Sequence, residues 1–208
     1  MKILQKFFPD LTERQLSQYS LMEALYREWN ERINVISRKD IGQFAIHHLL
    51  HSLSIAQAIT VVPGTTIMDA GTGGGFPGIP LAVMFPQTEF VLVDSIGKKI
   101  KVIEAVKSEL ALENVSTRNV RFETIRETFD FVTGRAVSNL SLFYSIVKNN
   151  IKKQQINSIP NGILYLTGGE TDEILMLIHA KATTWNLADF FPDSFFSTKK
   201  LIHLSPIK

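Results

Sequence analysis

The residues of this sequence best suited to chemistry are glycines gathered in one short segment. Of the 12 glycines in the chain, five fall within eight residues: Gly71, Gly73, Gly74, Gly75 and Gly78. An apolar run typical of a buried strand precedes them, and a helical pattern follows. Glycine allows a ligand to approach the main chain closely. A tight turn needs only one glycine, so the cluster predicts a ligand-binding loop.

Two acidic residues suggest which ligand the loop holds. Asp69 precedes Gly71 by two positions and gives the pattern Asp-x-Gly-x-Gly-x-Gly, which resembles the first motif of class I methyltransferases. The loop also matches the dinucleotide fingerprint by letter, as Gly73-x-Gly75-x-x-Gly78. Asp94 ends the next strand-like run, where an acid can accept hydrogen bonds from both ribose hydroxyls. We therefore expect a nucleoside cofactor, and Asp69 favours S-adenosylmethionine over NAD.

Basic residues lie close to these motifs in the sequence. Lys98, Lys99 and Lys101 fall near the start of the next expected helix, and Arg118 and Arg121 follow it. They could hold RNA phosphates or simply form a solvated helix face. The chain has 22 Lys and Arg against 20 Asp and Glu, a net charge of +2. A nucleic-acid partner must therefore bind a local basic patch.

Composition excludes several other kinds of site. The chain contains no cysteine, which rules out a disulfide scaffold, a cysteine-ligated metal and a thiol nucleophile. His47 and His51 are four residues apart, but no third ligand is apparent and we expect no metal. The stretch 41–68 lacks Asp, Glu, Lys and Arg, yet its histidines and the Pro63–Gly64 turn argue against a membrane span. We expect a buried second helix over 41–60, followed by that turn.

The elements that must position these residues alternate between helix and strand. Thr12 and Gln15 form a capping-box pattern, which indicates the start of a helix. We expect residues 1–60 to be a helical extension packed on a main domain, 61–208. Apolar periodicity predicts strands at 65–70, 89–94, 120–122, 130–133, 162–166 and 200–204, and helices at 80–85, 99–112, 140–151 and 173–181. This order predicts an α/β fold, a Rossmann-like, doubly wound and mostly parallel sheet. The aromatic run 189–196 is interpreted as packing at the core edge.

Longer stretches of the sequence resemble one family. The segment Gly71-Thr-Gly-Gly-Gly-Phe-Pro-Gly-Ile-Pro-Leu, followed by Leu92-Val-Asp-Ser-Ile-Gly-Lys-Lys, resembles the glucose-inhibited division protein B family. Further similarities are His48-Leu-Leu-His-Ser-Leu and Phe131-Val-Thr-Gly-Arg-Ala, and the resemblance spans residues 29–169. These proteins are bacterial methyltransferases that act on N7 of a guanine in small-subunit (16S) ribosomal RNA.

The resemblance implies roles for particular residues. The cofactor S-adenosylmethionine would contact the loop at Asp69, Gly71, Gly73, Gly75 and Phe76. Asp94 would bind its ribose, and Phe122 and Glu123 would flank its adenine. Arg135 would lie beside both the cofactor and the RNA. Lys98, Lys99, Lys101 and Arg135 would contact RNA, and His48 is a positioning candidate with Arg135. The family often has Asp where this chain has His51, and Lys where it has Thr167.

The chemistry implied by the resemblance needs no catalytic base. Guanine N7 carries a free lone pair, so methylation is a matter of aligning nucleophile, methyl carbon and sulfur. The target guanine should be unstacked or flipped, because N7 is poorly accessible in folded RNA. We expect a cytoplasmic monomer that acts on 16S rRNA within the small ribosomal subunit.

Three alternatives remain open on the sequence. The chain could methylate another acceptor, or bind RNA without catalysis. It could also be an NAD-dependent reductase, for which Tyr144 and Lys148 have the Tyr-x-x-x-Lys spacing of a proton donor.

Overall fold

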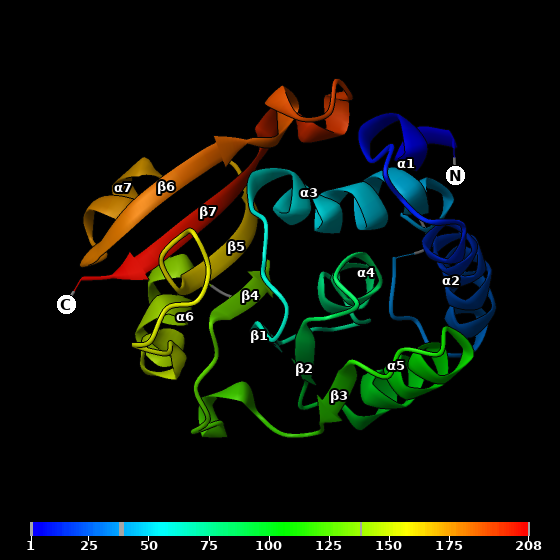
Figure 1. The fold of residues 1–208 in the computed structure, drawn as a ribbon, viewed down its shortest axis with the longest axis horizontal. Coiled ribbons are helices and arrows are strands. Elements are labelled where there is room, and N and C mark those ends of the chain that lie inside the picture. The colour runs from blue at the N-terminus through cyan, green and yellow to red at the C-terminus, as the bar shows by residue number, and fades with distance from the viewer. Residues whose placement is uncertain (1, 38–39, 138, 208) are drawn as a thin grey trace.

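A computed structural model describes residues 2–37, 40–137 and 139–207. Its centre is a seven-stranded sheet with the order β3-β2-β1-β4-β5-β7-β6 (Figure 1). The strands are β1 (Thr66–Ala70), β2 (Glu89–Val93), β3 (Val115–Arg118), β4 (Phe131–Arg135), β5 (Gly162–Gly168), β6 (Ala180–Asn186) and β7 (Lys199–Pro206). Strands β1 to β5 are parallel, and β7 runs antiparallel to both β5 and β6. The predicted α/β fold with a mostly parallel sheet is confirmed.

Helices cover both faces of the sheet. The α-helices are α1 (Lys2–Phe7), α2 (Glu13–Arg32), α3 (His51–Ala58), α4 (Gly78–Met84), α5 (Gly97–Glu109), α6 (Leu140–Val147) and α7 (Asp172–Met176). One core lies between the sheet and the helices α2 to α5, and a second lies between the sheet and α6. Short 3-10 helices occur at η1 (Ile41–Gln43), η3 (Phe122–Thr124), η4 (Lys148–Asn150), η5 (Leu187–Asp189) and η6 (Ser194–Thr198), and a π-helix at η2 (Phe44–Leu50).

The strand order reverses between β1 and β4. From β1 the chain proceeds outward to β2 and β3, and then returns to place β4 on the other side of β1. In sheets of this kind the crevice at the carboxyl ends of the strands, beside the reversal, is where ligands bind. The glycine segment follows β1 directly, and Arg135 is the last residue of β4.

The N-terminal helices pack on the sheet's helical layer. Thr12 and Gln15 form the predicted capping box at the start of α2. Tyr19, Met22 and Tyr26 are buried on one face of this helix, and α2 contacts both α4 and α5. The expected second helix over 41–60 is instead a succession of η1, η2 and α3, because its first ten residues adopt 3-10 and π geometry.

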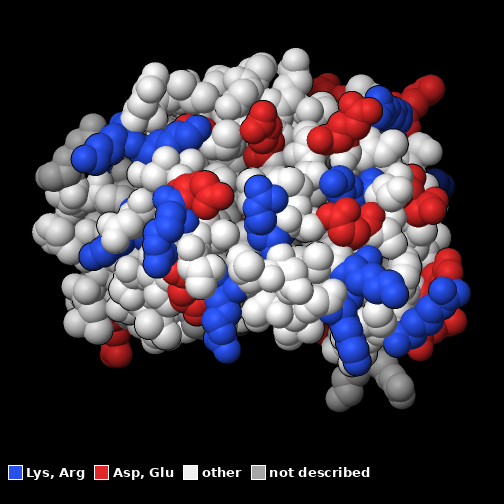
Figure 2. All heavy atoms as spheres, turned by 90° about the horizontal axis from the view of Figure 1, so that it is seen from below, with Lys and Arg blue, Asp and Glu red and all other residues white. Residues whose placement is uncertain are grey.

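Two predicted elements are wrong. The strand expected at 120–122 is a loop that leads into η3, and the third strand lies earlier, at Val115–Arg118. The helix expected over 173–181 ends at Met176, and residues 180–186 form the edge strand β6. Within the described residues, no helix is long and apolar enough to cross a bilayer. In the view of Figure 2, basic and acidic side chains are mixed over the surface.

Candidate functional site

A fully buried carboxylate holds the glycine loop in place. Asp69, in β1, accepts hydrogen bonds from the Thr72 hydroxyl and from the backbone N–H of Gly78, at 2.9 Å. Its other oxygen accepts from the Thr133 hydroxyl of β4, at 3.0 Å. Burial raises the pKa of Asp69, which these hydrogen bonds oppose. Asp69 therefore links Thr72 and Gly78, at the two ends of the loop, to Thr133 of β4.

Asp94 fixes the opposite side of the loop. One carboxylate oxygen accepts from the backbone N–H of Gly73 at 2.9 Å, and the other accepts from that of Ile96 at 2.8 Å. Lys99 lies 3.8 Å from the first oxygen. Each carboxylate oxygen can accept a second hydrogen bond. Asp94 can therefore brace the loop and still bind hydroxyl groups of a ligand.

A pocket of about 390 Å³ opens over these residues. Its lining comes from the loop, from the ends of β2 and β4 and from the segment before η3: Val35, Gly71, Thr72, Gly73, Gly74, Phe76, Asp94, Ser95, Ile96, Lys99, Arg121, Phe122, Glu123, Arg135, Ala136 and Val137. Gly73 has a φ of +61°, and a side chain added there would meet only open space. The loop thus presents its backbone to the pocket.

Arg135 is held by main-chain and histidine acceptors. Its guanidinium donates to the His47 carbonyl at 3.4 Å and faces Nδ1 of His48 at 3.3 Å. It also lies 5.1 Å from the centre of the Phe76 ring. Burial lowers the pKa of Arg135 to about 10, so it stays charged at neutral pH. Among the residues that the structure describes, Arg135 forms no ion pair with a carboxylate, so it is suited to an anionic or carbonyl oxygen in the pocket.

His48 is a neutral, buried residue in this arrangement. A guanidinium only donates, so Nδ1 of His48 must accept and Nε2 carries the hydrogen. Burial, together with the charge of Arg135, lowers the pKa of His48 to about 3. The ring packs 5.0 Å from Phe76 and 5.9 Å from Phe44. His48 therefore orients Arg135 and cannot act as a base near neutral pH.

The helix α2 supports the loop from the side opposite the sheet. The Tyr26 hydroxyl donates to the Gly74 carbonyl, and its ring packs 4.8 Å from Phe76. Asn30 accepts from the backbone N–H groups of Val35 and Ile36, which brings Val35 to the pocket wall. The N-terminal region thus contributes directly to the pocket.

Most of the residues predicted from the sequence come together here. Gly71, Gly73, Phe76, Asp94, Phe122, Glu123, Arg135 and Lys99 all line the pocket. Asp69 and Gly75 are buried and hold the loop without lining the pocket. Lys98 and Lys101 are exposed on α5 outside it. Lys99 differs from Lys98 and Lys101 because its ammonium lies 3.8 Å from Asp94 and it lines the pocket.

Sequence reasoning missed part of the wall. Ser95 and Ile96 directly follow Asp94, and Val137 follows the segment that ends in Arg-Ala, so their position next to the motifs is the available signal. Val35 is separated from the glycine loop by more than one element, and its local pattern gives it no site role.

Several other sequence features lie elsewhere in the fold. The Tyr144 hydroxyl donates to the backbone carbonyl of His179 at 2.9 Å, and Tyr144 does not line the pocket. His51 is buried against the rings of Phe195 and Phe196. Thr167, in β5, pairs with Lys200 of β7. No three His, Asp or Glu residues of the described chain are grouped to hold a metal ion.

Comparison with known proteins identifies the relatives of this chain. The GidB family model, described as rRNA small subunit methyltransferase G, matches residues 13–185. The chain belongs to the GidB family. A ribosomal RNA small subunit methyltransferase G of Flavobacterium johnsoniae is 50% identical over 100% of this chain and 99% of its own length. Its counterpart from Parabacteroides distasonis is 52% identical over 97% of this chain and 88% of its own length.

Solved structures support the fold. A SAM dependent methyltransferase from Aquifex aeolicus has a TM-score of 0.58 at 14% identity and covers 81% of this chain and 98% of its own. An rRNA methylase from Streptococcus thermophilus has a TM-score of 0.53 at 13% identity, covering 78% and 99%. The GidB chain therefore has the class I methyltransferase fold.

Proposed function

We propose that this GidB-family chain transfers a methyl group from S-adenosylmethionine to N7 of a guanine in 16S ribosomal RNA. The observation that carries the proposal is the 50% identity, over the whole chain, to an enzyme named as a ribosomal RNA small subunit methyltransferase. The substrate is the rRNA of the small ribosomal subunit, and the enzyme works as a monomer in the cytoplasm. Residues 1–60 serve as an extension that completes the cofactor pocket.

The pocket residues fit S-adenosylmethionine. Asp94 has oxygens for the ribose hydroxyls, and Phe122 and Glu123 offer an apolar face and an acceptor for the adenine. The open backbone at Gly73 leaves room for the ligand, and Gly71 allows the turn before it. Arg135 supplies a cation at the end of β4 for the methionine carboxylate or the guanine. Asp69 and Gly75 act indirectly, through the loop.

The chain's own residues position the reactants. The cofactor supplies an electrophilic methyl group on a sulfonium. Guanine N7 attacks without losing a proton, so the low pKa of His48, which makes it a poor base, is no obstacle. Arg135, fixed by His47 and His48, holds its partner in one orientation. Alignment of this kind is the main source of rate enhancement when no base is needed.

The donor and the acceptor class can be tested together. Calorimetric titration should show binding of S-adenosylmethionine and none of NAD. Methyl-labelled cofactor should then transfer label to small subunits, or to naked 16S rRNA, from cells that lack this enzyme. Binding of NAD alone would favour the reductase. If S-adenosylmethionine binds and label appears only in protein or small molecules, the chain has another methyl acceptor. If S-adenosylmethionine binds and no label is transferred, the chain has a non-catalytic role.

A further inference from the structure

A second cleft lies beside Arg135, outside the cofactor pocket. Its volume is about 410 Å³, and its lining comes from η1, η2 and the segment around η6: Gln43, Ile46, His47, Asp193, Ser194 and Phe195. This volume is within the range of small-molecule sites. The described lining contains no residue of the cofactor pocket, so the two are separate spaces and the function derived above assigns the cleft no ligand.

The cleft adjoins the ligand-binding edge of the sheet. The backbone carbonyl of His47 accepts from Arg135, which links one wall of the cleft to the end of β4. Lys199 begins β7 and pairs with Gly168, the last residue of β5. Because β7 is antiparallel to β5, Lys199 lies at the same edge as Arg135. A substrate that reaches the cofactor from this side passes the cleft.

Two stacked rings form one wall. The His47 imidazole lies parallel to the Phe195 ring, with centroids 4.0 Å apart and planes 15° apart. Hydrogen bonds from Ser37 and His47 lower the pKa of Asp40, so its carboxylate accepts from Nδ1–H of His47, at 2.9 Å, and holds the imidazole in this plane. Phe191 and Phe196 are buried, as expected for packing at the core edge, whereas Phe195 stays partly exposed. Both rings are partly exposed, and an aromatic ring with part of its surface open can stack with a nucleobase.

The remaining groups suit the polar parts of a nucleotide. Gln43 and Ser194 bring donors and acceptors to the cleft, and Asp193 brings a carboxylate of which one oxygen accepts from the Phe195 N–H. The Lys199 ammonium lies 5.0 Å from the Phe195 ring centre. It forms no ion pair with a described residue, whereas its neighbour Lys200 lies 3.8 Å from Glu170. Lys199 is therefore available for a phosphate.

We propose that this cleft binds an unstacked nucleobase of the RNA substrate, close to the base that is methylated, with Lys199 at its phosphate. The inference rests on the proposed function. A guanine must leave its stack to reach the cofactor, and enzymes that extrude a base also contact the nucleotides that flank it. Rings, hydrogen-bonding groups and an unpaired cation together recognise such a nucleotide.

Matched variants test the cleft. Phe195→Leu removes the aromatic plane but keeps an apolar side chain, and Phe190→Leu, on the same segment outside the cleft, is its control. Phe195→Leu should raise KM for RNA roughly tenfold, the order expected for one lost stacking contact, with the affinity for S-adenosylmethionine unchanged. Phe190→Leu should leave KM for RNA as it is. Thermal melting shows that each variant is folded.

A second pair of variants does not depend on the aromatic packing. Lys199→Gln should weaken RNA binding and reduce the slope of log K against log salt by about 0.7, the value for one phosphate of a single strand. Lys200→Gln, whose side chain lies on the opposite face of the sheet, should change neither. Anisotropy with labelled RNA measures both effects.

The outcomes separate this inference from the function beneath it. If the wild-type enzyme methylates RNA but Phe195→Leu and Lys199→Gln match their controls, the cleft does not bind a base and only this inference fails. If the wild-type enzyme neither binds nor methylates RNA, the proposed function fails and the inference falls with it.

Discussion

At the scale of single residues, the Asp94 carboxylate both holds the glycine loop and lines the pocket. It accepts from the backbone at Gly73 and Ile96, and it faces the pocket with its remaining lone pairs. Asp94→Ala removes both the brace and the ribose acceptor. Each hydrogen bond to a charged group contributes about 1.5–3 kcal/mol, so we expect S-adenosylmethionine affinity to fall roughly 100-fold or more.

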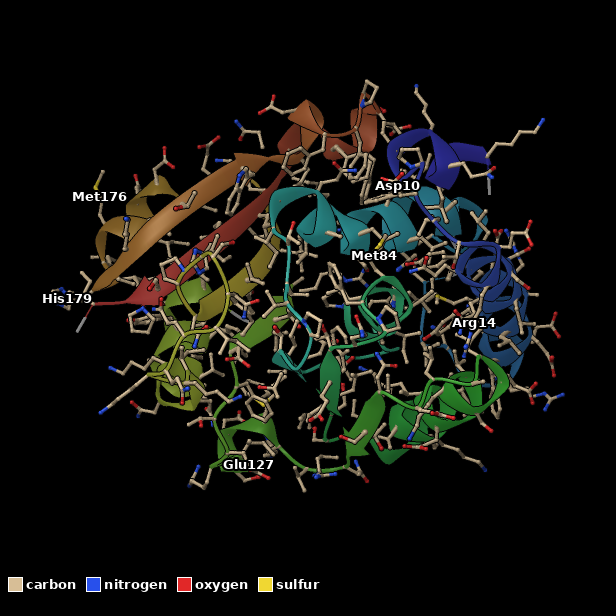
Figure 3. All side chains as sticks on the ribbon, viewed as in Figure 1. Asp10, Arg14, Met84, Glu127, Met176 and His179 are labelled. Carbon is tan, nitrogen blue, oxygen red and sulfur yellow. The ribbon has the colours of Figure 1, made fainter. Side chains whose placement is uncertain are left out.

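Isothermal titration of wild type and Asp94→Ala measures this loss. Asp94→Asn keeps one acceptor oxygen and should lie between the two. Glu127→Ala is a suitable control, because Glu127 is exposed on a loop at the lower margin of the view in Figure 3. Equal cofactor affinity in wild type and Asp94→Ala would remove the assignment of Asp94 to the ribose.

His48 makes stability depend on pH. Its pKa is lowered from an ordinary 6.5 to about 3 by burial, so below pH 6.5 the unfolded chain binds a proton that the folded chain does not. The contribution of neutral His48 to the free energy of unfolding is therefore fully present above pH 6.5 and is lost progressively as pH falls toward 3. His48→Asn keeps an acceptor for Arg135 and cannot be protonated. The free energy of unfolding of wild type, relative to this variant, should fall by roughly 2 kcal/mol between pH 7.5 and 4.5.

Urea unfolding at the two pH values checks this prediction. His179→Asn is the control, because His179 is exposed directly before β6, at the left of Figure 3. If the difference between wild type and His48→Asn stays constant with pH, the low pKa of His48 is wrong.

Most residues of the pocket could be predicted because they lie in short, local motifs. The glycine loop and Asp94 each follow a strand directly, and in a parallel sheet the strand ends meet. The sequence placed Asp69 at the site, but it did not show that the side chain is buried beneath the loop. The amino-acid pattern of a strand buried on both faces does not indicate to which face a residue points. His47 and His48 meet Arg135 across 88 and 87 residues, so no local pattern shows these contacts, and only the family resemblance names His48 together with Arg135.

At the scale of elements, α2 is part of the cofactor site. Its Tyr26 hydroxyl donates to the glycine loop, whereas its Tyr19 hydroxyl donates to Pro80 in α4. Tyr26→Phe and Tyr19→Phe each remove one buried hydrogen bond, so each should destabilise the fold by about 1 kcal/mol. Only Tyr26→Phe should also weaken S-adenosylmethionine binding, by roughly fivefold, because the loop loses its support.

Chemical unfolding and calorimetry on the two variants give both quantities. Equal effects of the two substitutions on cofactor binding would mean that α2 contributes to stability alone.

The elements that could not be predicted have little apolar alternation. Strand β3 reads Val-Ser-Thr-Arg, and only Val115 is buried, so its pattern is weak. Strand β6 is an edge strand whose residues are mostly exposed, and its composition gives no core face. The helical spacing of 173–181 is real as far as Met176, but pairing with β7 draws the following residues into the sheet. Long-range pairing of this kind overrides local preference.

At the scale of the whole molecule, a net charge of +2 limits how RNA is bound. Acidic and basic side chains are mixed over the face in Figure 2, so we expect attraction to come from a few residues. Lys98 and Lys101 are exposed on α5, whose neighbour Lys99 lines the cofactor pocket. The double variant Lys98→Gln and Lys101→Gln should lower the log K against log salt slope by about 1.4–1.8 and leave cofactor affinity unchanged.

Filter or anisotropy titrations over a range of salt concentrations measure that slope. A double variant with the wild-type slope would show that these lysines form a solvated helix face and that RNA lies elsewhere.

The identity of the modified atom tests the central claim most directly. Small-subunit rRNA from cells lacking this enzyme is treated with the protein and methyl-labelled S-adenosylmethionine, digested to nucleosides and analysed by mass. The account predicts label in N7-methylguanosine with the wild-type protein and much less with Asp94→Ala. Label in any other nucleoside, or equal label from the two proteins, would contradict it.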